Sequence, residues 1–245
     1  MTGKIRIGVG GWTFEPWRDN FYPAELRQAD ELAFAARALT AIEVNGTYYG
    51  TQKPETFRRW ASETPEGFVF TLKAPRFATS RRVLAEGGES IARFLASGLT
   101  ELGPKLGPIN WQLPPTKKFD PDDMAAFLDL LPDRLEGLPL HHAIEARHES
   151  FACDAFTDLL RGRNIAAVQA ADSEYPQIDT PTAPFAYLRI MGTREGEPHG
   201  YSEADLDRWA DRLRDMAKAR DVFLFVISGH KAANPAAARA LIQRL

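Results

Sequence analysis

The chain has 245 residues, of which 44% are hydrophobic and 26% are charged. This content allows a large core, and α/β barrels of about 250 residues fold as one unit, so residues 1–245 are expected to form a single domain. The formal net charge of −3 does not indicate a nucleic-acid partner, because duplex-DNA binders usually carry a basic face. An average charge can still conceal a local basic patch.

The cellular compartment is suggested by the cysteine count and by the N-terminus. The single cysteine, Cys153, excludes an internal disulfide framework and is typical of a reducing compartment. The first apolar run is too short and too rich in glycine for a signal peptide. No stretch approaches the roughly 18–20 apolar residues of a membrane helix. These features predict a cytoplasmic protein with no membrane partner.

Short apolar runs recur along the whole chain, and each predicts a β-strand. In chain order they lie at residues 5–9, 41–45, 68–73, 107–113, 141–147, 165–172, 185–191 and 221–227. The stretches between several of them show helical periodicity, at residues 23–39, 54–62, 89–102, 121–131 and 202–219, with a final helix from Pro235. Asp120, Ser202 and Asn234 are the expected N-caps. The segments 74–90 and 173–184 are the least regular, and both follow strands.

Strands that alternate with helices predict βαβ units and parallel pairing. Eight such repeats in this length favour a TIM-like (β/α)8 barrel of the α/β class. A doubly wound open sheet is the alternative, and it often carries a glycine-rich phosphate loop after its first strand. The segment 8–12 (GVGGW) is not G-x-G-x-x-G, and no helix follows it at once, so a dinucleotide site is not indicated there.

Most of the predicted strands carry polar residues late, after an apolar start. An inward residue at this position of a barrel strand lies at the carboxyl-end mouth, where barrel active sites sit. The residues are Glu43, Asn45, Lys73, Asn110, Gln112, Glu145, Arg147, Asp172 and Arg189. Charges are unfavourable inside a barrel unless they are paired or solvated, so this clustering is hard to explain by packing alone.

The mixed charges favour an enzyme that acts on a small anionic or sugar-like metabolite. Glu43 or Glu145 would be the acid/base group, and Arg147 and Arg189 would bind the anion. Lys73 would be an electrostatic partner, or would form a Schiff base if it were desolvated and neutral. Tyr48 follows the second strand and His230 the eighth, and both are further candidates for the ligand pocket. The sequence identifies neither a cofactor nor an oligomeric state.

Three other interpretations of the same residues stay open. The first is a structural ion-pair layer that caps the barrel, and the second is a non-catalytic binding or regulatory module. The third is a metal-dependent nucleic-acid-processing barrel that uses Glu43, Glu145 and Asp172. A bound metal is disfavoured because cations are interleaved with these carboxylates.

Five blocks of sequence carry a family resemblance, at residues 7–23, 41–76, 102–115, 143–151 and 181–192. In their order and spacing they resemble the YecE-like family, a domain of unknown function. The resemblance implies a TIM-like barrel and no particular activity. The polar residues it implies are Glu43, Asn45, Tyr48, Lys73, Gln112, Glu145, Arg147 and Arg189. The family tends to carry two asparagines at the end of the last strand, where this chain has Ser228-Gly229-His230, so His230 is the candidate in their place.

Overall fold

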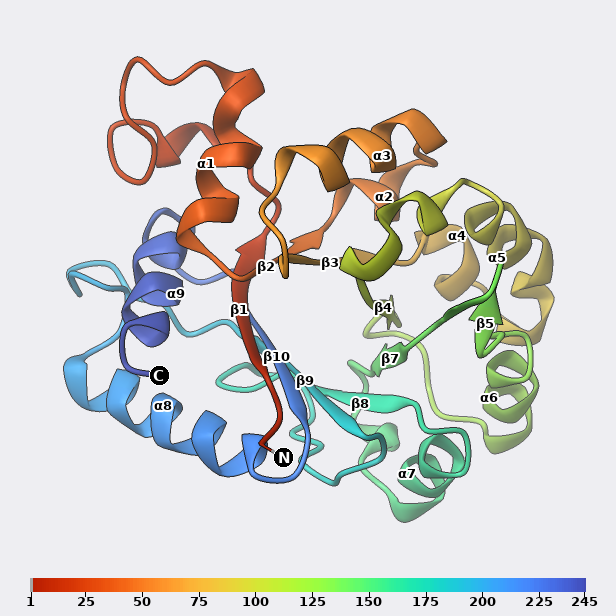
Figure 1. Cartoon of the computed structure of the whole chain (residues 1–245). Helices are drawn as coiled ribbons and strands as arrows, with labels where there is room; N and C mark the ends of the chain where they lie inside the picture. The colour runs from red at the N-terminus through yellow and green to blue at the C-terminus, as the bar shows by residue number, and fades with distance from the viewer. Residues whose placement is uncertain (1) are drawn as a thin grey trace.

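The computed structural model describes residues 2–245, and its centre is a closed barrel of eight parallel strands (Figure 1). Going round the barrel, the strands follow the order β1-β10-β9-β8-β7-β4-β3-β2. Their bounds are Ile5–Gly10 (β1), Ala41–Val44 (β2), Val69–Lys73 (β3), Leu106–Gln112 (β4), His142–Glu145 (β7), Ala166–Gln169 (β8), Phe185–Ile190 (β9) and Asp221–Val226 (β10). The barrel closes where β1 pairs with β10. Each strand coincides with one of the predicted apolar runs, so the predicted (β/α)8 barrel is confirmed.

The helices surround the barrel (Figure 1). They are Glu31–Ala38 (α1), Gly46–Tyr49 (α2), Pro54–Glu63 (α3), Arg76–Thr79 (α4), Gly88–Leu95 (α5), Pro121–Leu128 (α6), Asp154–Arg161 (α7), Glu203–Ala217 (α8) and Asn234–Ile242 (α9). Short 3-10 turns lie at Glu15–Trp17, Gln28–Asp30, Leu84–Gly87, Leu99–Lys105, Glu149–Phe151 and Lys231–Ala233. A two-stranded hairpin, Arg134–Leu135 (β5) with Leu138–Pro139 (β6), precedes β7.

Several helix boundaries differ from the sequence expectation. The helix expected from Pro23 begins only at Glu31, after a 3-10 turn. The single helix expected over 89–102 is broken where Gly98 takes a positive φ of 88°. Helix α7 was not predicted at all.

Two of the three expected N-caps are confirmed. Asp120 accepts hydrogen bonds from two backbone amides of α6, and the Ser202 hydroxyl accepts one from the amide of Asp205. Asn234 is instead the first residue of α9, and its side-chain oxygen accepts a hydrogen bond from Thr193 Oγ1.

Two separate apolar cores result from the alternation of side chains along the strands. The larger core lies between the strands and the surrounding helices, and it includes Trp17, Phe57 and Trp111. The smaller core fills the inside of the barrel with residues such as Ala143, Phe185 and Phe225. The barrel is therefore packed through its lower part, and only the layer at the carboxyl ends of the strands is polar.

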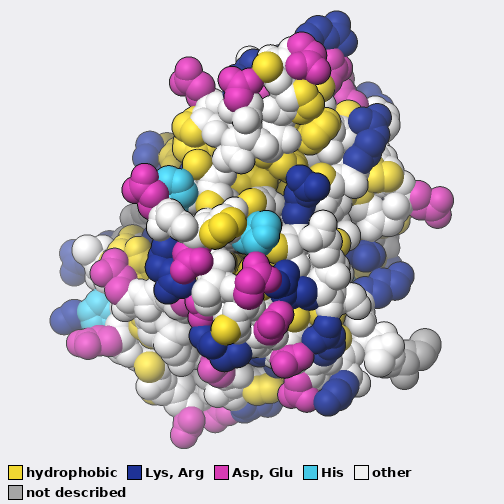
Figure 2. All heavy atoms as spheres, turned by 90° about the vertical axis from the view of Figure 1, so that its left-hand side faces the viewer, with side chains coloured by type: hydrophobic (Ala, Val, Ile, Leu, Met, Phe, Trp, Pro, Cys, Tyr) yellow, Lys and Arg dark blue, Asp and Glu magenta, His cyan; other side chains and the backbone are white. Residues whose placement is uncertain are grey.

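The surface shows no single-sign charge on the face that carries α1, α8 and α9. In Figure 2, charged side chains of both signs are interspersed over the lower part of this face, and hydrophobic side chains gather toward the top, where Figure 1 shows α1. Cys153 is exposed just before α7. Among residues 2–245, no helix is both long and apolar enough to cross a membrane.

Candidate functional site

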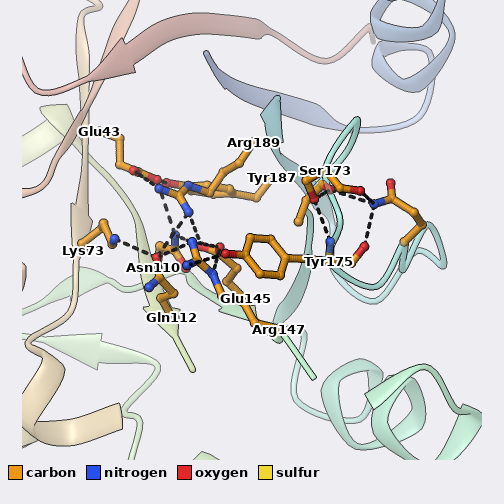
Figure 3. A network of polar contacts seen from close by, with 12 residues as sticks. Glu43, Lys73, Asn110, Gln112, Glu145, Arg147, Ser173, Tyr175, Tyr187 and Arg189 are labelled. Atoms are coloured by element: carbon orange, nitrogen blue, oxygen red, sulfur yellow. Dashed lines mark hydrogen bonds and ion pairs between the residues drawn. The ribbon is translucent and has the colours of Figure 1, made fainter. Parts of the chain in front are cut away.

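The deepest polar layer at the barrel mouth is built around one arginine. Arg189 donates hydrogen bonds to Glu145 Oε2 at 2.5 Å and to Glu43 Oε1 at 3.0 Å. Both glutamates are 0% exposed and Arg189 is 4% exposed. The three residues come from β7, β2 and β9, so the barrel brings them together from distant parts of the chain (Figure 3). We call Glu43, Glu145 and Arg189 the inner layer.

Neutral side chains also hydrogen-bond to the carboxylates of the inner layer. The Tyr187 hydroxyl donates to Glu43 Oε2 at 2.7 Å, and Thr71 Oγ1 lies 3.1 Å from the same hydroxyl. The Asn110 amide nitrogen lies 3.2 Å from Glu145 Oε2 and 3.4 Å from Glu43 Oε2. Both carboxylates are therefore paired with a cation and also hydrogen-bonded, as buried charges require.

Burial and neighbouring charges shift the pKa values of Glu145, Arg189 and Tyr187. Burial by itself raises the pKa of Glu145, but the charges of Arg189, Arg147 and Lys73 outweigh it and bring the pKa to about 2. Burial lowers the pKa of Arg189, but the two glutamates raise it above its ordinary value. Burial and Glu43 raise the pKa of Tyr187 well above its ordinary value. Glu145 is therefore ionised at neutral pH and pairs with Arg147 and Arg189.

A second layer lies on the solvent side of the first, and Gln112 organises it. Gln112 Oε1 accepts hydrogen bonds from Lys73 Nζ at 2.8 Å, from Arg147 Nη2 at 2.9 Å and from Arg189 Nη1 at 3.3 Å. Arg147 also contacts Glu145 Oε1 at 2.7 Å. The cations of this layer lie on aromatic faces, since Lys73 Nζ is 4.4 Å from the Tyr48 ring and Arg147 is 4.4 Å from the Tyr175 ring. We call Lys73, Gln112, Arg147, Tyr48 and Tyr175 the outer layer.

Lys73 differs from the other charged residues of the two layers. Its hydrogen-bond partner is the neutral amide of Gln112, whereas Arg147 and Arg189 contact carboxylates. The pKa of Lys73 is lowered to about 8, first by burial and then by the charge of Arg189, against the opposing charges of Glu43 and Glu145. A buried lysine with a lowered pKa is a recurrent feature of catalytic amines.

The two layers together carry an excess of positive charge. Three cations (Lys73, Arg147 and Arg189) face two carboxylates (Glu43 and Glu145). The uncompensated charge lies toward the mouth, because the inner layer is sealed whereas the Arg147 side chain is 17% exposed. An anionic group bound at the mouth would balance this charge.

Of the eleven residues predicted from the sequence, the structure places seven in these two layers, hydrogen-bonds Asn110 to the inner one, and leaves Asn45, Asp172 and His230 outside. Asn45 is half-buried beside the two layers and lines a hollow of about 370 Å³ with Gly10 and Trp12. Its amide lies against Gly10, where an added Cβ would come within 2.8 Å of Asn45 Nδ2. Asn45 therefore stays close to the mouth without bonding to either layer.

Asp172 is not part of the mouth, which corrects the sequence expectation. Strand β8 ends at Gln169, and Asp172 lies in the following loop with a positive φ of 50°, so strand alternation no longer directs its side chain inward. Its carboxylate accepts hydrogen bonds from the Tyr201 hydroxyl at 2.5 Å and from the amide of Met191 at 2.6 Å. It lines a separate hollow of about 500 Å³ beside α8.

His230 also lies away from the two layers. Strand β10 ends at Val226, and Ser228 and Gly229 both take positive φ values, so the chain turns before it reaches His230. The His230 side chain is exposed, and its backbone amide donates to Thr193. The eighth barrel strand therefore adds no polar side chain to either layer.

The structure does not bring together the three carboxylates that the metal-dependent alternative requires. It required Glu43, Glu145 and Asp172 to converge, but Asp172 lies in another hollow. Within residues 2–245, the structure gathers no group of three or more His, Cys, Asp or Glu side chains that could hold a metal ion.

Tyr175 is the site residue that sequence reasoning missed. It lies in the irregular loop after β8, which has no periodic pattern that could signal it. Ser173 Oγ accepts a hydrogen bond from the Tyr175 amide, and Gln177 donates to the Tyr175 carbonyl and to the carbonyl of Ala170. These local bonds shape the loop so that the Tyr175 ring covers Arg147 (Figure 3).

Comparison with known proteins shows to which family the chain belongs. The family model described as "Protein of unknown function DUF72" matches residues 6–245. The UPF0759 protein YecE of Escherichia coli K12 is 29% identical over 150 residues, which are 60% of this chain and 50% of YecE. The UPF0759 protein YunF of Bacillus subtilis is 30% identical over 70 residues, 29% of this chain and 24% of YunF. The chain thus matches about half the length of YecE and less of YunF.

Solved structures agree with this relationship. The DUF72 family protein of Thermotoga maritima is 25% identical, covers 98% of this chain and 97% of its own, and superposes with a TM-score of 0.77. D-psicose 3-epimerase of Clostridium cellulolyticum, crystallised with D-tagatose, superposes with a TM-score of 0.53 at 11% identity over 97% of this chain and 91% of its own. The latter likeness concerns the barrel fold alone. From the match over residues 6–245, the chain belongs to the DUF72 family.

Proposed function

We propose that the protein is an enzyme that acts on a small anionic metabolite at the barrel mouth, with Lys73 as the reacting group. One observation carries this proposal: the Lys73 amine is 7% exposed, hydrogen-bonds to a neutral amide and has a pKa lowered to about 8. With such a pKa, roughly a tenth of the amines are neutral at pH 7, far more than for an ordinary lysine. A neutral amine can attack a carbonyl carbon or accept a proton.

The substrate would be held by the charge excess of the outer layer. Arg147 offers a planar guanidinium beside Lys73, which suits a carboxylate or phosphate. An oxo group on the same small molecule would then lie near the Lys73 nitrogen. The nitrogen would bond to the carbonyl carbon, and the carbonyl oxygen would leave as water to give an imine.

The inner layer has a positioning role in this proposal. Glu145 contacts Arg147 and Arg189, and Arg189 contacts Gln112, the hydrogen-bond partner of Lys73. Removing any of these groups would shift the amine and the guanidinium relative to each other. This role replaces the acid/base role that the sequence suggested for Glu43 and Glu145.

Reductive trapping tests the reactive lysine. The protein is incubated at pH 8 with pyruvate or D-glyceraldehyde 3-phosphate as probe, reduced with sodium borohydride and digested for mass spectrometry. We expect the Lys73 peptide to be labelled at least tenfold faster than the peptide with Lys105, a lysine whose amine donates to the carbonyls of Ala61 and Thr64. Labelling of Lys73 no faster than Lys105 with both probes would contradict the proposal.

Anion binding tests the outer layer separately. Inorganic phosphate should raise the melting temperature of the wild-type protein in a concentration-dependent way, because a ligand that binds only the folded state stabilises it. Arg147→Met should abolish most of this shift. Arg214→Met, at an exposed arginine of α8 that pairs with Asp211, should leave it intact. If phosphate raises the melting temperature equally in both variants, Arg147 does not bind the anion.

A non-catalytic binding module is the second candidate function. The saturation of both inner-layer carboxylates favours it, because neither is free to take part in proton transfer. The two candidates predict the same anion binding. They differ in the expected result of reductive trapping. A binding module needs no reactive amine, so Lys73 should not be labelled faster than Lys105.

We also propose a cytoplasmic location. Cys153 is exposed and free, and an exposed free thiol is typical of a reducing compartment. Fractionation of cells that produce the native protein would test this.

A further inference from the structure

Aromatic side chains are unusually exposed on one side of the mouth. Within residues 2–245, three of the four exposed large hydrophobic residues, Tyr49, Phe77 and Val83, lie in the segments that follow β2 and β3. Tyr49 is 68% exposed and Phe77 is 61% exposed. Both line one hollow of about 330 Å³, which we call the aromatic pocket, together with Arg81 and Arg93. Exposed aromatic surface grouped in one concave place is typical of a binding site.

A second hollow beside it is strongly basic. It has a volume of about 460 Å³ and is lined by Arg81, Arg82, Lys117 and Lys118 from the loops that follow β3 and β4. We call it the basic pocket. Its one acidic residue, Asp120, is engaged as the N-cap of α6. Lys117 pairs with Asp123 at 2.6 Å, so the charges available in this pocket are those of Arg81, Arg82 and Lys118.

The two pockets adjoin each other, and the aromatic pocket adjoins the outer layer. Arg81 lines both, and its guanidinium donates to the Phe77 carbonyl at 2.9 Å and lies 3.2 Å from Ser90 Oγ. Tyr49 packs edge-on against Tyr48 at 5.1 Å between ring centroids, and Tyr48 covers Lys73. A ligand that spans both pockets would therefore have one end close to the mouth.

We infer that these two pockets bind a nucleotide, with the base in the aromatic pocket against Tyr49 and Phe77 and the phosphates in the basic pocket with Arg82 and Lys118. A base presents flat faces that stack on aromatic rings, and phosphates are bound by arginine and lysine. Of these two pockets, inorganic pyrophosphate, which has no base, would use only the basic one, and an uncharged aromatic ligand would use only the aromatic one. This inference goes beyond the proposed function, because binding here does not require Lys73 to react.

Isothermal titration of the whole protein with ADP tests the aromatic pocket. Phe77→Ala and Tyr49→Ala should each weaken ADP binding about 5- to 150-fold, the range expected for loss of one base-stacking contact. Both side chains are largely exposed, so neither change should affect folding, which the melting temperature checks. Binding of inorganic pyrophosphate, which has no base, should stay within twofold of wild type in both variants.

Charge-reversal variants and the salt dependence of ADP binding test the basic pocket. Arg82→Glu with Lys118→Glu should weaken both ADP and pyrophosphate at least tenfold, and the dependence of ADP binding on salt concentration should become shallower. Lys218→Glu is the matched control, because Lys218 is 72% exposed at the end of α8. It should change neither affinity by more than twofold.

Three outcomes would overturn the inference. One is the absence of ADP binding at millimolar concentration, and another is ADP binding that neither pair of variants alters. The third is a ten-residue oligothymidylate that binds at least 100-fold more tightly than ADP and loses affinity in the same variants, which would assign the surface to single-stranded nucleic acid instead. Because these are binding measurements, failure of lysine trapping would not affect them.

Discussion

The inner and outer layers of the mouth differ in how their charges are stabilised. In the inner layer, Arg189 lies between Glu43 and Glu145, and every charge is sealed and paired. In the outer layer, Lys73 and Arg147 lie on tyrosine rings and share the oxygen of Gln112, and Arg147 also pairs with Glu145. Ion pairs support structure, whereas Lys73, whose hydrogen-bond partner is neutral, retains capacity for an anionic ligand.

The largest expected effect comes from removing the shared cation of the inner layer. Arg189→Met leaves Glu43 buried without its counter-charge and leaves Glu145 with Arg147 alone, which should lower the free energy of unfolding by about 3–5 kcal/mol. Urea denaturation at pH 7 measures this. Arg214→Met, at an exposed ion pair, should lose less than about 1 kcal/mol. Similar losses in the two variants would show that the inner layer is not the structural one.

The next effect is a pH dependence that belongs to Glu145. Its pKa is about 2 in the folded protein and 4.5 ordinarily, so its contribution to stability is present above pH 4.5 and is lost as the pH falls toward 2. The contribution is about 3 kcal/mol. Urea denaturation between pH 6 and pH 2.5 should show this loss in the wild type and a shallower loss in Glu145→Gln. If stability falls equally with pH in the wild type and in Glu145→Gln, the loss does not belong to Glu145.

Lys73 in the outer layer should give a pH dependence of the same sign at higher pH, but its charge destabilises the protein at neutral pH whereas that of Glu145 stabilises it. The pKa of Lys73 falls from 10.5 to about 8 on folding, so the unfolded chain binds more protons between these values and wild-type stability from this group rises with pH across that window. At pH 7 the buried ammonium costs about 3 kcal/mol, which the bond to Gln112 and the contact with Tyr48 offset in part.

Lys73→Met should therefore stabilise the protein by about 1–2 kcal/mol at pH 7 in urea denaturation. It should also remove the rise in stability between pH 8 and pH 10. Gain of stability on loss of a charged group is typical of a functional site that carries a strained residue. If Lys73→Met instead destabilises the protein, Lys73 has a structural role like that of the inner layer.

The smallest expected effect concerns the ring over Arg147. Tyr175→Leu removes the cation–π contact and should lower the free energy of unfolding by about 0.5–1 kcal/mol. Tyr175→Phe keeps the ring and loses only the 3.3 Å hydrogen bond from Arg147 Nη1, so it should stay closer to wild type in the same urea titration. A larger loss in Tyr175→Phe would show that the hydroxyl, not the ring, stabilises Arg147.

The barrel itself could be predicted from local patterns, because strands and amphipathic helices leave periodic signals in the sequence. The late polar positions could be predicted for the same reason, since alternation directs Glu43, Lys73, Glu145 and Arg189 to the inside of the barrel. Where a strand ends early, the same rule fails. Asp172 lies three residues beyond β8, and its positive φ takes it out of the barrel.

The chemistry of the mouth was decided only by the tertiary structure. The sequence determined which charges meet there, but which of them are sealed and which keep capacity for a ligand depends on contacts between strands far apart in the chain, as with Arg189 and Glu43, 146 positions apart. Tyr175 reaches Arg147 from a loop without periodicity, and the basic and aromatic pockets form where the loops after β2, β3 and β4 adjoin. Pairing and burial set these properties, and neither is a local property of the sequence.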